Sequence, residues 1–366
     1  MIMSETEKAA KLCDRNFPVT EEYVKLTGRT RMKDGIRWII FSAGKAEFRM
    51  TGTRAAVTVC GDAAATGDDP LTRTRIAVYV NGKRTLDHMI EKAEETLEVF
   101  AAEEATDVTI GIIKLSEATN SVFGIKCIDV TSIGEIEPLP EKELKLEFIG
   151  DSITCGYGID DEDENHHFQT ATEDATRAYA YKTAMALDAD YSLVSYSGHG
   201  IISGYTENGQ RLETHKVPDV YEKLGKTYGS ANGYIDLNEP WDFSNYVPDY
   251  IIINLGTNDS SYTEEIPERM EEFTAAYIEF LKMVRRNNPA SHLVCALGVM
   301  DGRLCPCVED AAKLYTAETG DGNLSTLRFT PHDGKAGYVA DFHPTEKTNE
   351  IAAGVLIAHL RGLIEE

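Results

Sequence analysis

Two side chains in the second half of the chain, a serine and a histidine, are of the types that acyl-transfer chemistry requires. Ser152 follows Gly150 and Asp151 directly after an apolar run that we expect to be a buried strand. A serine hydroxyl is a poor nucleophile until a base removes its proton, and an imidazole such as that of His343 does this near neutral pH. Gly-Asp-Ser also occurs in ordinary polar turns, so the tripeptide alone leaves a turn and a nucleophile as equal alternatives.

Two further polar segments carry the other groups that acyl transfer needs. Gly198 lies two residues after Tyr196, Asn258 lies two residues after Gly256, and both segments come directly after expected strands. A tetrahedral intermediate bears a negative oxygen that must receive hydrogen bonds from fixed donors. The order of these segments, and their placement at strand ends, favours a catalytic serine over a turn.

The elements around these residues predict a mostly parallel sheet that is covered by helices on both faces. Strands are expected over 146–149, 191–196, 250–254 and 293–297, and helices over 175–187, 266–284 and 345–364. Apolar residues recur at steps of three or four in the helix 266–284, and Thr345 can cap the last helix. Because working residues gather at the carboxyl ends of strands in such sheets, the polar segments are expected to meet at one edge.

The first half of the chain predicts an all-β domain. Strands are expected over 37–50, 55–60, 75–80, 96–100, 107–115 and 124–130, with a break at 51–53 and a hairpin turn at 81–82. Short strands at this spacing are typical of a β-sandwich such as a jelly roll. A stretch rich in proline and glutamate, 135–143, marks the boundary. We therefore expect a β-sandwich domain over 1–138 and an α/β domain over 139–366.

Composition and charge indicate which classes of partner are excluded and in which cellular compartment the protein is expected. The formal net charge of -25 over 366 residues argues against nucleic acid or an anionic membrane as a partner. No apolar run reaches the length of a membrane span, and the N-terminus lacks the pattern of a signal peptide. The seven cysteines are scattered and odd in number, which fits reduced thiols better than a disulfide framework. We expect a cytoplasmic protein, and the sequence leaves its oligomeric state open.

Together these segments make the chain resemble the SGNH (GDSL-type) hydrolases. Gly150-Asp151-Ser152 matches the first block of that family, Gly198 the second, Gly256-Thr257-Asn258-Asp259 the third, and Asp341 with His343 the last. The resemblance covers the whole second half and implies a three-layer α/β/α domain. It implies that Ser152 is the nucleophile and His343 the general base. The oxyanion-hole donors would be the Ser152 and Gly198 N–H groups and the Asn258 side chain, with no metal ion or organic cofactor.

The last block departs from the family pattern at one position. The general pattern has an acid three residues before the base, where this chain has Ala340, whereas Asp341 lies only two residues before His343. Side chains two apart point in different directions from side chains three apart. We expect Asp341 to orient the histidine, with a backbone carbonyl in that role as the alternative.

A narrower resemblance, to carbohydrate esterase family 2, spans nearly the entire chain. It is carried by Gly28-Arg29-Thr30 and Glu47–Thr53 in the first half, and by Thr170–Ala175 and Trp241-Asp242-Phe243 in the second. That family joins a jelly-roll domain to an SGNH domain and removes acetyl groups from polysaccharides such as xylan and mannan. The resemblance implies a serine esterase that deacetylates plant-derived oligosaccharides through an acetyl-enzyme.

Trp241, Asp259 and His199 are the remaining candidates for substrate binding. Aromatic faces stack on sugar rings, which makes Trp241 a candidate platform, with packing between the domains as the alternative. Asp259 adjoins Asn258 and His199 adjoins Gly198, so both lie beside the expected oxyanion hole. Each could serve the structure of its loop instead.

Two other functions stay open. An SGNH hydrolase of another ester, such as a lipid, a thioester or an aryl acetate, would use the same residues with a different pocket. A glycan-binding module that has lost activity would usually lack the serine, the base or an oxyanion donor, and all three are present in this sequence.

Overall fold

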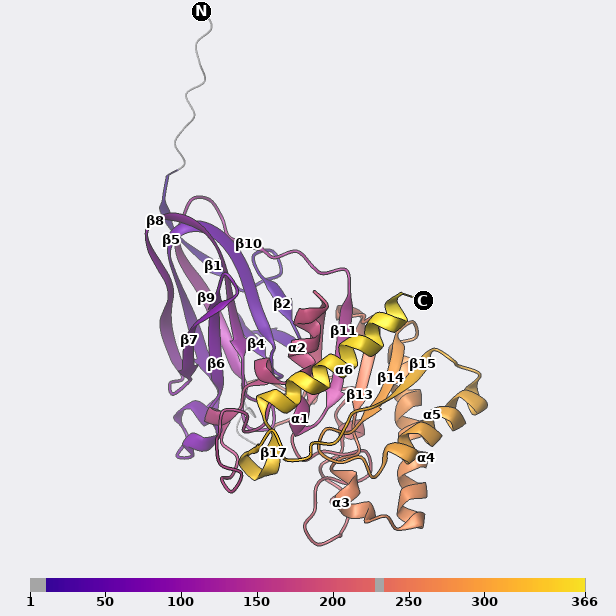
Figure 1. Cartoon of the computed structure of the whole chain (residues 1–366). Coiled ribbons are helices and arrows are strands. Elements are labelled where there is room, and N and C mark those ends of the chain that lie inside the picture. Colours follow the sequence, from indigo (N-terminus) through magenta and orange to yellow (C-terminus); the bar gives the residue numbers. More distant parts are fainter. Residues whose placement is uncertain (1–10, 228–233, 366) are drawn as a thin grey trace, which may run out of the picture.

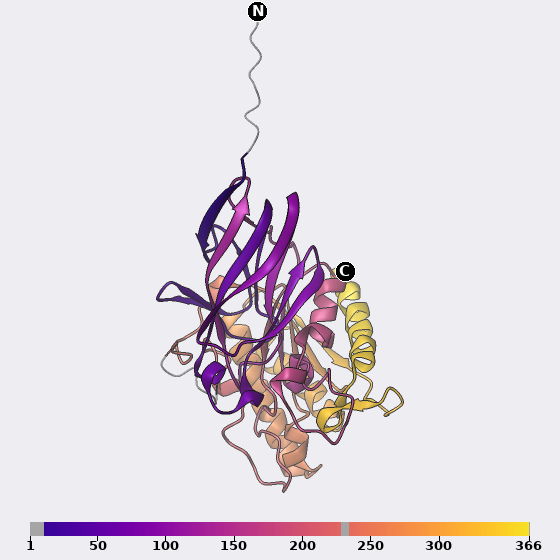
Figure 2. The ribbon, with the colours of Figure 1, turned by 90° about the vertical axis from the view of Figure 1, so that its left-hand side faces the viewer.

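A computed structural model describes residues 11–227 and 234–365, which fold into an antiparallel β-domain and an α/β domain (Figure 1). The strands of the β-domain are β1 (Cys13–Pro18), β2 (Lys25–Thr27), β3 (Thr30–Lys33), β4 (Ile36–Ile39), β5 (Lys45–Gly61), β6 (Arg75–Val80), β7 (Lys83–Met89), β8 (Glu94–Lys114), β9 (Phe123–Ser132) and β10 (Glu137–Pro138). They are joined in the order β3-β4-β9-β5-β8-β6-β7, with β1 beside β9 and with β2 and β10 beside β5. Figure 2 shows the long strands lying side by side.

Alternation of apolar and polar residues gives β5 one buried face. Phe48 and Met50 are buried, whereas Arg49 between them is exposed. The expected break at 51–53 is wrong, because β5 runs through Gly52 with shifts of register beside it. A Cβ at Gly52 would lie 2.4 Å from the Thr131 carbonyl oxygen. A glycine at this position lets the neighbouring strand approach closely. The shift of register is a β-bulge within the strand and not a turn between two strands.

The second domain contains a parallel sheet of five strands. These are β11 (Lys145–Gly150), β12 (Asp190–Ser195), β13 (Tyr250–Asn254), β14 (His292–Leu297) and β15 (Leu324–Arg328), in the order β12-β11-β13-β14-β15. The helices are α1 (Ser152–Cys155), α2 (Tyr179–Ala186), α3 (Asp259–Thr263), α4 (Pro267–Asn287), α5 (Cys305–Thr319) and α6 (Glu346–Ile364). A short hairpin of β16 (Tyr338–Val339) and β17 (His343–Pro344) flanks the 3-10 turn η7 (Ala340–Phe342). Further 3-10 turns are η1 (Ala63–Thr66), η2 (Pro70–Thr72), η3 (Thr170–Thr172), η4 (Ala175–Arg177), η5 (Val217–Asp219) and η6 (Phe243–Asn245).

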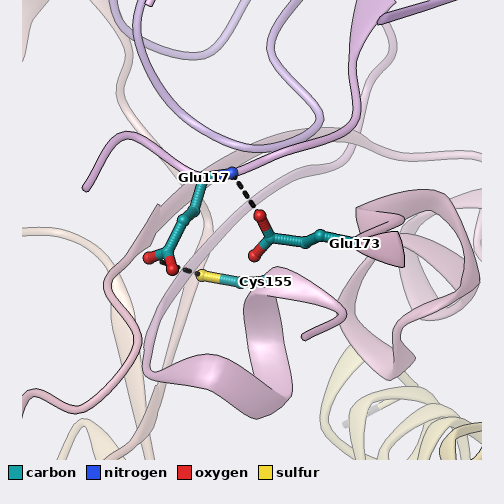
Figure 3. Close-up of side chains that lie close together, drawn as sticks. All are labelled: Glu117, Cys155 and Glu173. Carbon is teal, nitrogen blue, oxygen red and sulfur yellow. Dashed lines mark hydrogen bonds between the residues drawn. The ribbon is translucent and has the colours of Figure 1, made fainter. Parts of the chain in front are cut away.

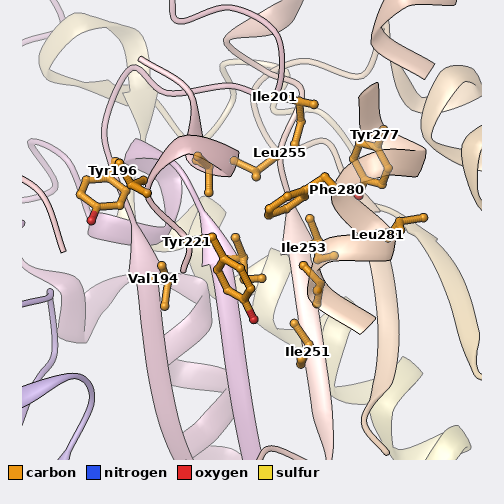
Figure 4. Packing of buried hydrophobic residues seen from close by; sticks show 14 of the residues in the cluster. Val194, Tyr196, Ile201, Tyr221, Ile251, Ile253, Leu255, Tyr277, Phe280 and Leu281 are labelled. Carbon is orange, nitrogen blue, oxygen red and sulfur yellow. The ribbon is translucent and has the colours of Figure 1, made fainter. Parts of the chain in front are cut away.

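Helices cover both faces of this sheet, as the apolar strand sequences predict. On one face, Ile251 and Ile253 of β13 pack with Tyr277 and Phe280 of α4 (Figure 4). On the other face, Ile252 belongs to a buried cluster that includes residues of α2 and α6. The predicted order of an antiparallel β-domain followed by a layered α/β domain is confirmed. The predicted domain boundary at 138 and 139 falls between β10 and β11.

The two domains share buried cores. Phe41, which follows β4, stacks edge-on against Tyr196 at the end of β12, with ring centroids 5.2 Å apart. Trp38 and Phe41 belong to the same buried cluster as the residues between the sheet and α4. The β-domain is therefore fastened to the α/β domain close to the carboxyl ends of the parallel strands. Within the described residues, no helix is both long and apolar enough to cross a membrane.

Candidate active site

Ser152 lies at the carboxyl end of β11, at the start of a single helical turn. Asp151 caps this turn by accepting a hydrogen bond from the Ile153 N–H at 3.1 Å. A Cβ at Gly150 would lie 2.0 Å from Thr154 Oγ1, so a glycine lets the helical turn begin this close to the strand. Ser152 is 6% exposed and lines a cavity. The strand and the turn thus present its hydroxyl at the sheet edge where we expected it.

His343 stands directly over this serine. Its Nε2 lies 2.9 Å from Ser152 Oγ, and its Nδ1 lies 3.2 Å from each of two main-chain oxygens, those of Ala340 and Asp341. A carbonyl oxygen only accepts hydrogen bonds, so these contacts place the imidazole proton on Nδ1. Nε2 is then free to accept the proton of the serine hydroxyl. This is the geometry of a nucleophile with its general base.

The Asp341 carboxylate does not have the position expected of an acid that orients His343. Asp341 adopts a left-handed conformation with φ 50°, which turns its side chain away from the imidazole. The carboxylate instead accepts hydrogen bonds from Tyr157 OH at 2.6 Å, the Phe168 N–H at 3.2 Å and His167 Nδ1 at 2.9 Å. The main chain of the turn, rather than this carboxylate, makes the described contacts to His343 Nδ1.

Tyr157 is a residue of the site that the sequence analysis missed. Its ring stacks on the His343 ring with centroids 3.9 Å apart and an interplanar angle of 20°. Although His343 keeps part of its surface open to the cavity, the surrounding protein desolvates the imidazole and lowers the pKa of His343 to about 4. The sequence signal was an aromatic residue between Gly156 and Gly158, directly after the helical turn that begins with Ser152.

The three expected oxyanion donors lie around the same cavity. Ser152, Gly198 and Asn258 all line it, and Gly198 has a φ of 72° in the turn after β12. Asn258 Nδ2 donates to the His199 carbonyl oxygen at 2.8 Å and lies 3.3 Å from Asp151 Oδ2. These contacts hold the side-chain amide of Asn258 beside the serine. The arrangement can therefore stabilise an oxyanion that forms at the serine.

Asp259 and His199, the other two candidates for substrate binding, are both buried and both bond the backbone of the loop beside this hole. The buried Asp259 carboxylate accepts hydrogen bonds from the N–H groups of Ile201, Ile202 and Ser203. Burial raises the pKa of Asp259 to about 6, and these backbone hydrogen bonds oppose the rise. His199 is also buried, with Nδ1 2.9 Å from the Ser197 carbonyl oxygen. Neither side chain lines the cavity around Ser152.

Trp241 is likewise not among the residues that line this cavity, and it has the position of the alternative expectation, in the packing between the domains. Its ring packs over the guanidinium of Arg29 from the β-domain, 5.2 Å from centroid to carbon. Arg29 is fully buried, and it also contacts the rings of Phe41, Tyr221 and Phe243. Trp241 thus belongs to the contact between the domains, where a buried cation is held by aromatic faces.

Aromatic side chains do occur at the mouth of the cavity, at other positions. The cavity has a volume of about 670 Å³, and Tyr205, Tyr338 and Phe342 line it. Tyr205 and Phe342 are 55% and 53% exposed, which is unusual for large aromatic rings. Arg303 and Asp301 form an ion pair on the same wall at 2.5 Å. None of these residues was expected in the site from the sequence, because none of them belongs to a motif of acyl-transfer chemistry.

Glu117, Cys155 and Glu173 are the one group of metal-ligand types that lies close together within the described ranges 11–227 and 234–365 (Figure 3). All three residues are buried. Glu117 Oε2 already accepts hydrogen bonds from the Ser197 N–H and the Thr119 hydroxyl. Because the buried ammonium of Lys114 lies beside the two glutamate carboxyls, we interpret the group as a hydrogen-bonded contact.

Comparison with known proteins matches both domains. A model of the GDSL-like Lipase/Acylhydrolase family matches residues 148–351, and a model of the carbohydrate esterase 2 N-terminal domain matches residues 26–140. Both resemblances drawn from the sequence are thereby confirmed.

Relatives and solved structures of similar sequence are named as esterases. The cellulase/esterase CelE of Acetivibrio thermocellus is 32% identical to this chain over 228 residues. These residues are 60% of this chain and 25% of CelE, so the chain spans about a quarter of the length of that relative. An acetyl xylan esterase, Est2A, from the rumen bacterium Butyrivibrio proteoclasticus is 26% identical, with a TM-score of 0.86 and coverage of 97% of this chain and 99% of that one. A family two carbohydrate esterase from Clostridium thermocellum in complex with cellohexaose is also 26% identical, with a TM-score of 0.78 and coverage of 93% and 99%.

Proposed function

Because the chain belongs to the GDSL-like Lipase/Acylhydrolase family, we propose that it is a serine esterase that removes O-acetyl groups from acetylated plant oligosaccharides of the xylan or mannan type. The observation that carries this proposal is the 2.9 Å contact between Ser152 Oγ and His343 Nε2, with Nδ1 turned toward two carbonyl oxygens. A nucleophile and a base in this arrangement, beside three hydrogen-bond donors, are what acyl transfer from an ester requires.

The reaction follows from the positions of these groups. Ser152 Oγ attacks the acetyl carbonyl carbon while its proton passes to His343 Nε2. The carbonyl oxygen becomes an oxyanion that faces the N–H groups of Ser152 and Gly198 and the amide of Asn258. His343 then gives the proton to the sugar oxygen as its bond to the acetyl carbon breaks. Water, deprotonated by the same imidazole, then attacks the acetyl-enzyme, and the imidazole returns that proton to Ser152 Oγ as its bond to the acetyl carbon breaks and acetate leaves.

Three observations support a carbohydrate as the leaving group. Exposed aromatic rings at the mouth of the cavity, such as Tyr205 and Phe342, can stack on sugar rings. The β-domain matches the carbohydrate esterase 2 N-terminal domain. The similar structures named above include an acetyl xylan esterase and a complex with cellohexaose.

The test is acetate release from acetylated xylo- and manno-oligosaccharides, with the remaining acetyl positions read by NMR. We expect release by the unaltered protein and none by the Ser152→Ala variant. Ser325→Ala, on β15 and away from the cavity, is the matched control and should retain full activity. Turnover by the Ser152→Ala variant would refute the assigned nucleophile. Binding of the oligosaccharides without any acetate release would make the protein a glycan-binding module instead.

A series of p-nitrophenyl esters from acetate to octanoate separates the proposed acetyl esterase from other ester hydrolases. Tyr157 and Asn258 line the same cavity as Ser152, and the proposed substrate carries the small acetyl group. We expect kcat/KM to fall as the acyl chain grows. A rise in kcat/KM from acetate toward octanoate would overturn the assignment of acetyl groups as substrate, and the protein would still be an esterase.

We also propose that the protein acts in the cytoplasm and needs neither nucleic acid nor a membrane as partner. The formal charge of -25 and seven cysteines in the free thiol form support this proposal. Fractionation of the source cells, with an antibody against the chain, tests it: detection outside the cytoplasmic fraction would reject it.

A further inference from the structure

The loop between β8 and β9 carries a buried carboxylate from the β-domain to the back of the candidate active site. Glu117, on this loop, is 1% exposed although it is an acidic residue. Its Oε2 accepts a hydrogen bond from the Ser197 N–H at 2.8 Å. Ser197 directly precedes Gly198 in the turn after β12, so the carboxylate holds the peptide next to an expected oxyanion donor.

The same carboxylate contacts the helical turn that presents the nucleophile. Cys155 Sγ lies 3.8 Å from Glu117 Oε2, and Cys155 is the last residue of the turn α1 that begins with Ser152 (Figure 3). Cys155 Sγ also lies 3.2 Å from Ser195 Oγ at the end of β12. One side chain of the β-domain therefore contacts both segments that carry the expected oxyanion donors Ser152 and Gly198, two residues that line the cavity.

Glu117 is itself held by buried groups, which keeps its carboxylate in place. Its N–H donates to Glu173 Oε2 at 2.7 Å, and its carbonyl oxygen accepts from Lys114 Nζ at 2.8 Å. Lys114 and Glu173 are fully buried. Desolvation lowers the pKa of Lys114 to about 8 and raises the pKa of Glu173 well above its usual range. The ammonium of Lys114 thus supplies a positive charge close to the buried carboxylate of Glu117.

We propose that Glu117 is a positioning residue for the oxyanion hole, so that the β-domain contributes to the active site and does not merely accompany it. Gly198 has a left-handed φ of 72° and its Cβ position faces open space, so hydrogen bonds rather than side-chain packing of this residue hold the turn. They join the Ser197 N–H to Glu117, His199 Nδ1 to the Ser197 carbonyl oxygen, and the Tyr205 N–H to the Gly198 carbonyl oxygen. Oxyanion donors act only when they lie about 2.7–3.1 Å from the reacting oxygen. A small rotation of the Ser197–Gly198 peptide would carry the Gly198 N–H out of that range. This inference rests on the proposed esterase function.

The first test replaces Glu117 by alanine and compares two reactions of the serine. Both p-nitrophenyl acetate hydrolysis and phosphorylation of the serine by diethyl p-nitrophenyl phosphate place negative charge on an oxygen in the hole. We expect kcat/KM and the second-order rate of phosphorylation to fall together by about 10- to 100-fold, which is below the loss of about 100- to 1000-fold that complete removal of one oxyanion donor produces. The Glu117→Gln variant keeps an oxygen that can accept the Ser197 N–H, so it should recover most of both rates.

The matched control is Glu147→Gln, another buried carboxylate, which accepts a hydrogen bond from Tyr221 OH and does not line the cavity. It should lower the melting temperature and leave both rates within about threefold of wild type. Equal rate losses in the Glu147→Gln and Glu117→Ala variants would show a general effect of destabilisation and reject the proposal. A folded Glu117→Ala variant with unchanged rates would also reject it.

A third variant covers the case in which Glu117→Ala does not fold. Glu117→Asp keeps the charge but shortens the side chain by one methylene, so this variant should fold and still lose rate. Glu117→Gln should also fold, and it should keep most of both rates. An aspartate variant with full activity would overturn the proposal. If the wild-type protein hydrolyses no ester and is not phosphorylated at Ser152, the proposed function itself fails, and that result is distinct from a failure of the Glu117 variants.

Discussion

The phenol ring of Tyr157 lies face to face with the imidazole of His343, with centroids 3.9 Å apart and planes inclined by 20°. In the proposed reaction the imidazole becomes a cation when it takes the serine proton, and a cation over an aromatic face is stabilised by the charge distribution of the ring. In many serine hydrolases a carboxylate on the histidine provides this stabilisation. Here two main-chain oxygens and an aromatic face surround the imidazole instead.

Replacing Tyr157 therefore tests the stacking contact. The Tyr157→Leu variant removes the aromatic face, and we expect kcat/KM to fall by about tenfold, since cation–π contacts contribute about 0.5–2 kcal/mol. The Tyr157→Phe variant keeps the face and loses only the hydroxyl, so its kcat/KM should stay within about threefold of wild type. Steady-state kinetics with p-nitrophenyl acetate measures both variants. Equal losses in the two variants would assign the effect to the hydroxyl and not to the ring.

The Asp341 carboxylate contacts Tyr157 and Phe168, so its substitution should cost far less than loss of a triad acid. Asp341→Asn keeps an oxygen that can accept from Tyr157 OH, and we expect a loss of kcat/KM below about tenfold. Replacing the acid of a Ser-His-Asp triad lowers kcat by about 10⁴. A loss of that size in Asp341→Asn would restore the carboxylate as the orienting group. Circular dichroism of the variant checks that the turn η7 and the rest of the fold persist.

The low pKa of His343 predicts activity that persists into acid. Because burial lowers this pKa to about 4, the imidazole stays neutral and able to accept a proton until the pH approaches 4. We expect the acid limb of kcat/KM to have its midpoint near pH 4 instead of near 6.5. The Asp151 carboxyl titrates at a higher pH than this acid limb, since burial raises its pKa to about 7. The Asp151→Asn variant should therefore lose any inflection near pH 7 and keep the acid limb, whereas an acid limb near 6.5 in both proteins would contradict the prediction.

The same shift has a consequence for stability with a definite sign. His343 is more easily protonated in the unfolded chain than in the fold, so protons favour unfolding. The contribution of the neutral His343 imidazole to the free energy of unfolding is fully present above about pH 6.5, the ordinary imidazole pKa. It is lost as the pH falls toward 4. His199 adds to the loss in the same window, because burial lowers its pKa to about 3. The carboxyls of Asp151 and Asp259, whose pKa values burial raises to about 7 and about 6, act in the opposite direction over the same window, so the histidine contribution is measured as a difference between proteins. In urea denaturation at pH 7 and at pH 4, the free energy of unfolding of the wild type minus that of His199→Gln should decrease as the pH falls.

Tyr205 should matter for a sugar substrate and not for a small ester. Its exposed ring lies at the mouth of the cavity and does not contact Ser152 or His343 by any described hydrogen bond or ring stacking. The Tyr205→Ala variant should raise KM for acetylated xylo-oligosaccharides by about 5- to 30-fold, the range of an aromatic contact of about 1–2 kcal/mol. Its kcat/KM for p-nitrophenyl acetate should stay unchanged. An equal loss on both substrates would place Tyr205 in the chemistry instead of in carbohydrate binding.

The order of elements and the reacting groups were predictable because both depend on local patterns. Apolar runs such as 250–254 form the parallel strands, and Ser152, Gly198 and Asn258 follow three of them, so sheet topology brings them to one edge. The alternation of polar and apolar residues likewise predicts the antiparallel strands of the first half. The bulge at Gly52 was not predictable, since it depends on how closely the neighbouring strand approaches.

Side-chain direction and long-range contacts were decided by the tertiary structure alone. Asp341 meets Tyr157 across 184 residues, and Glu117 meets Ser197 across 80, so no local pattern relates the members of either pair. A left-handed turn directs the Asp341 side chain away from His343, and the Trp241 ring packs against Arg29 instead of lining the cavity. The sequence by itself thus determined which groups can react and at which strand ends they lie. The folded chain decided which groups orient them, because orientation depends on packing between segments far apart in the sequence.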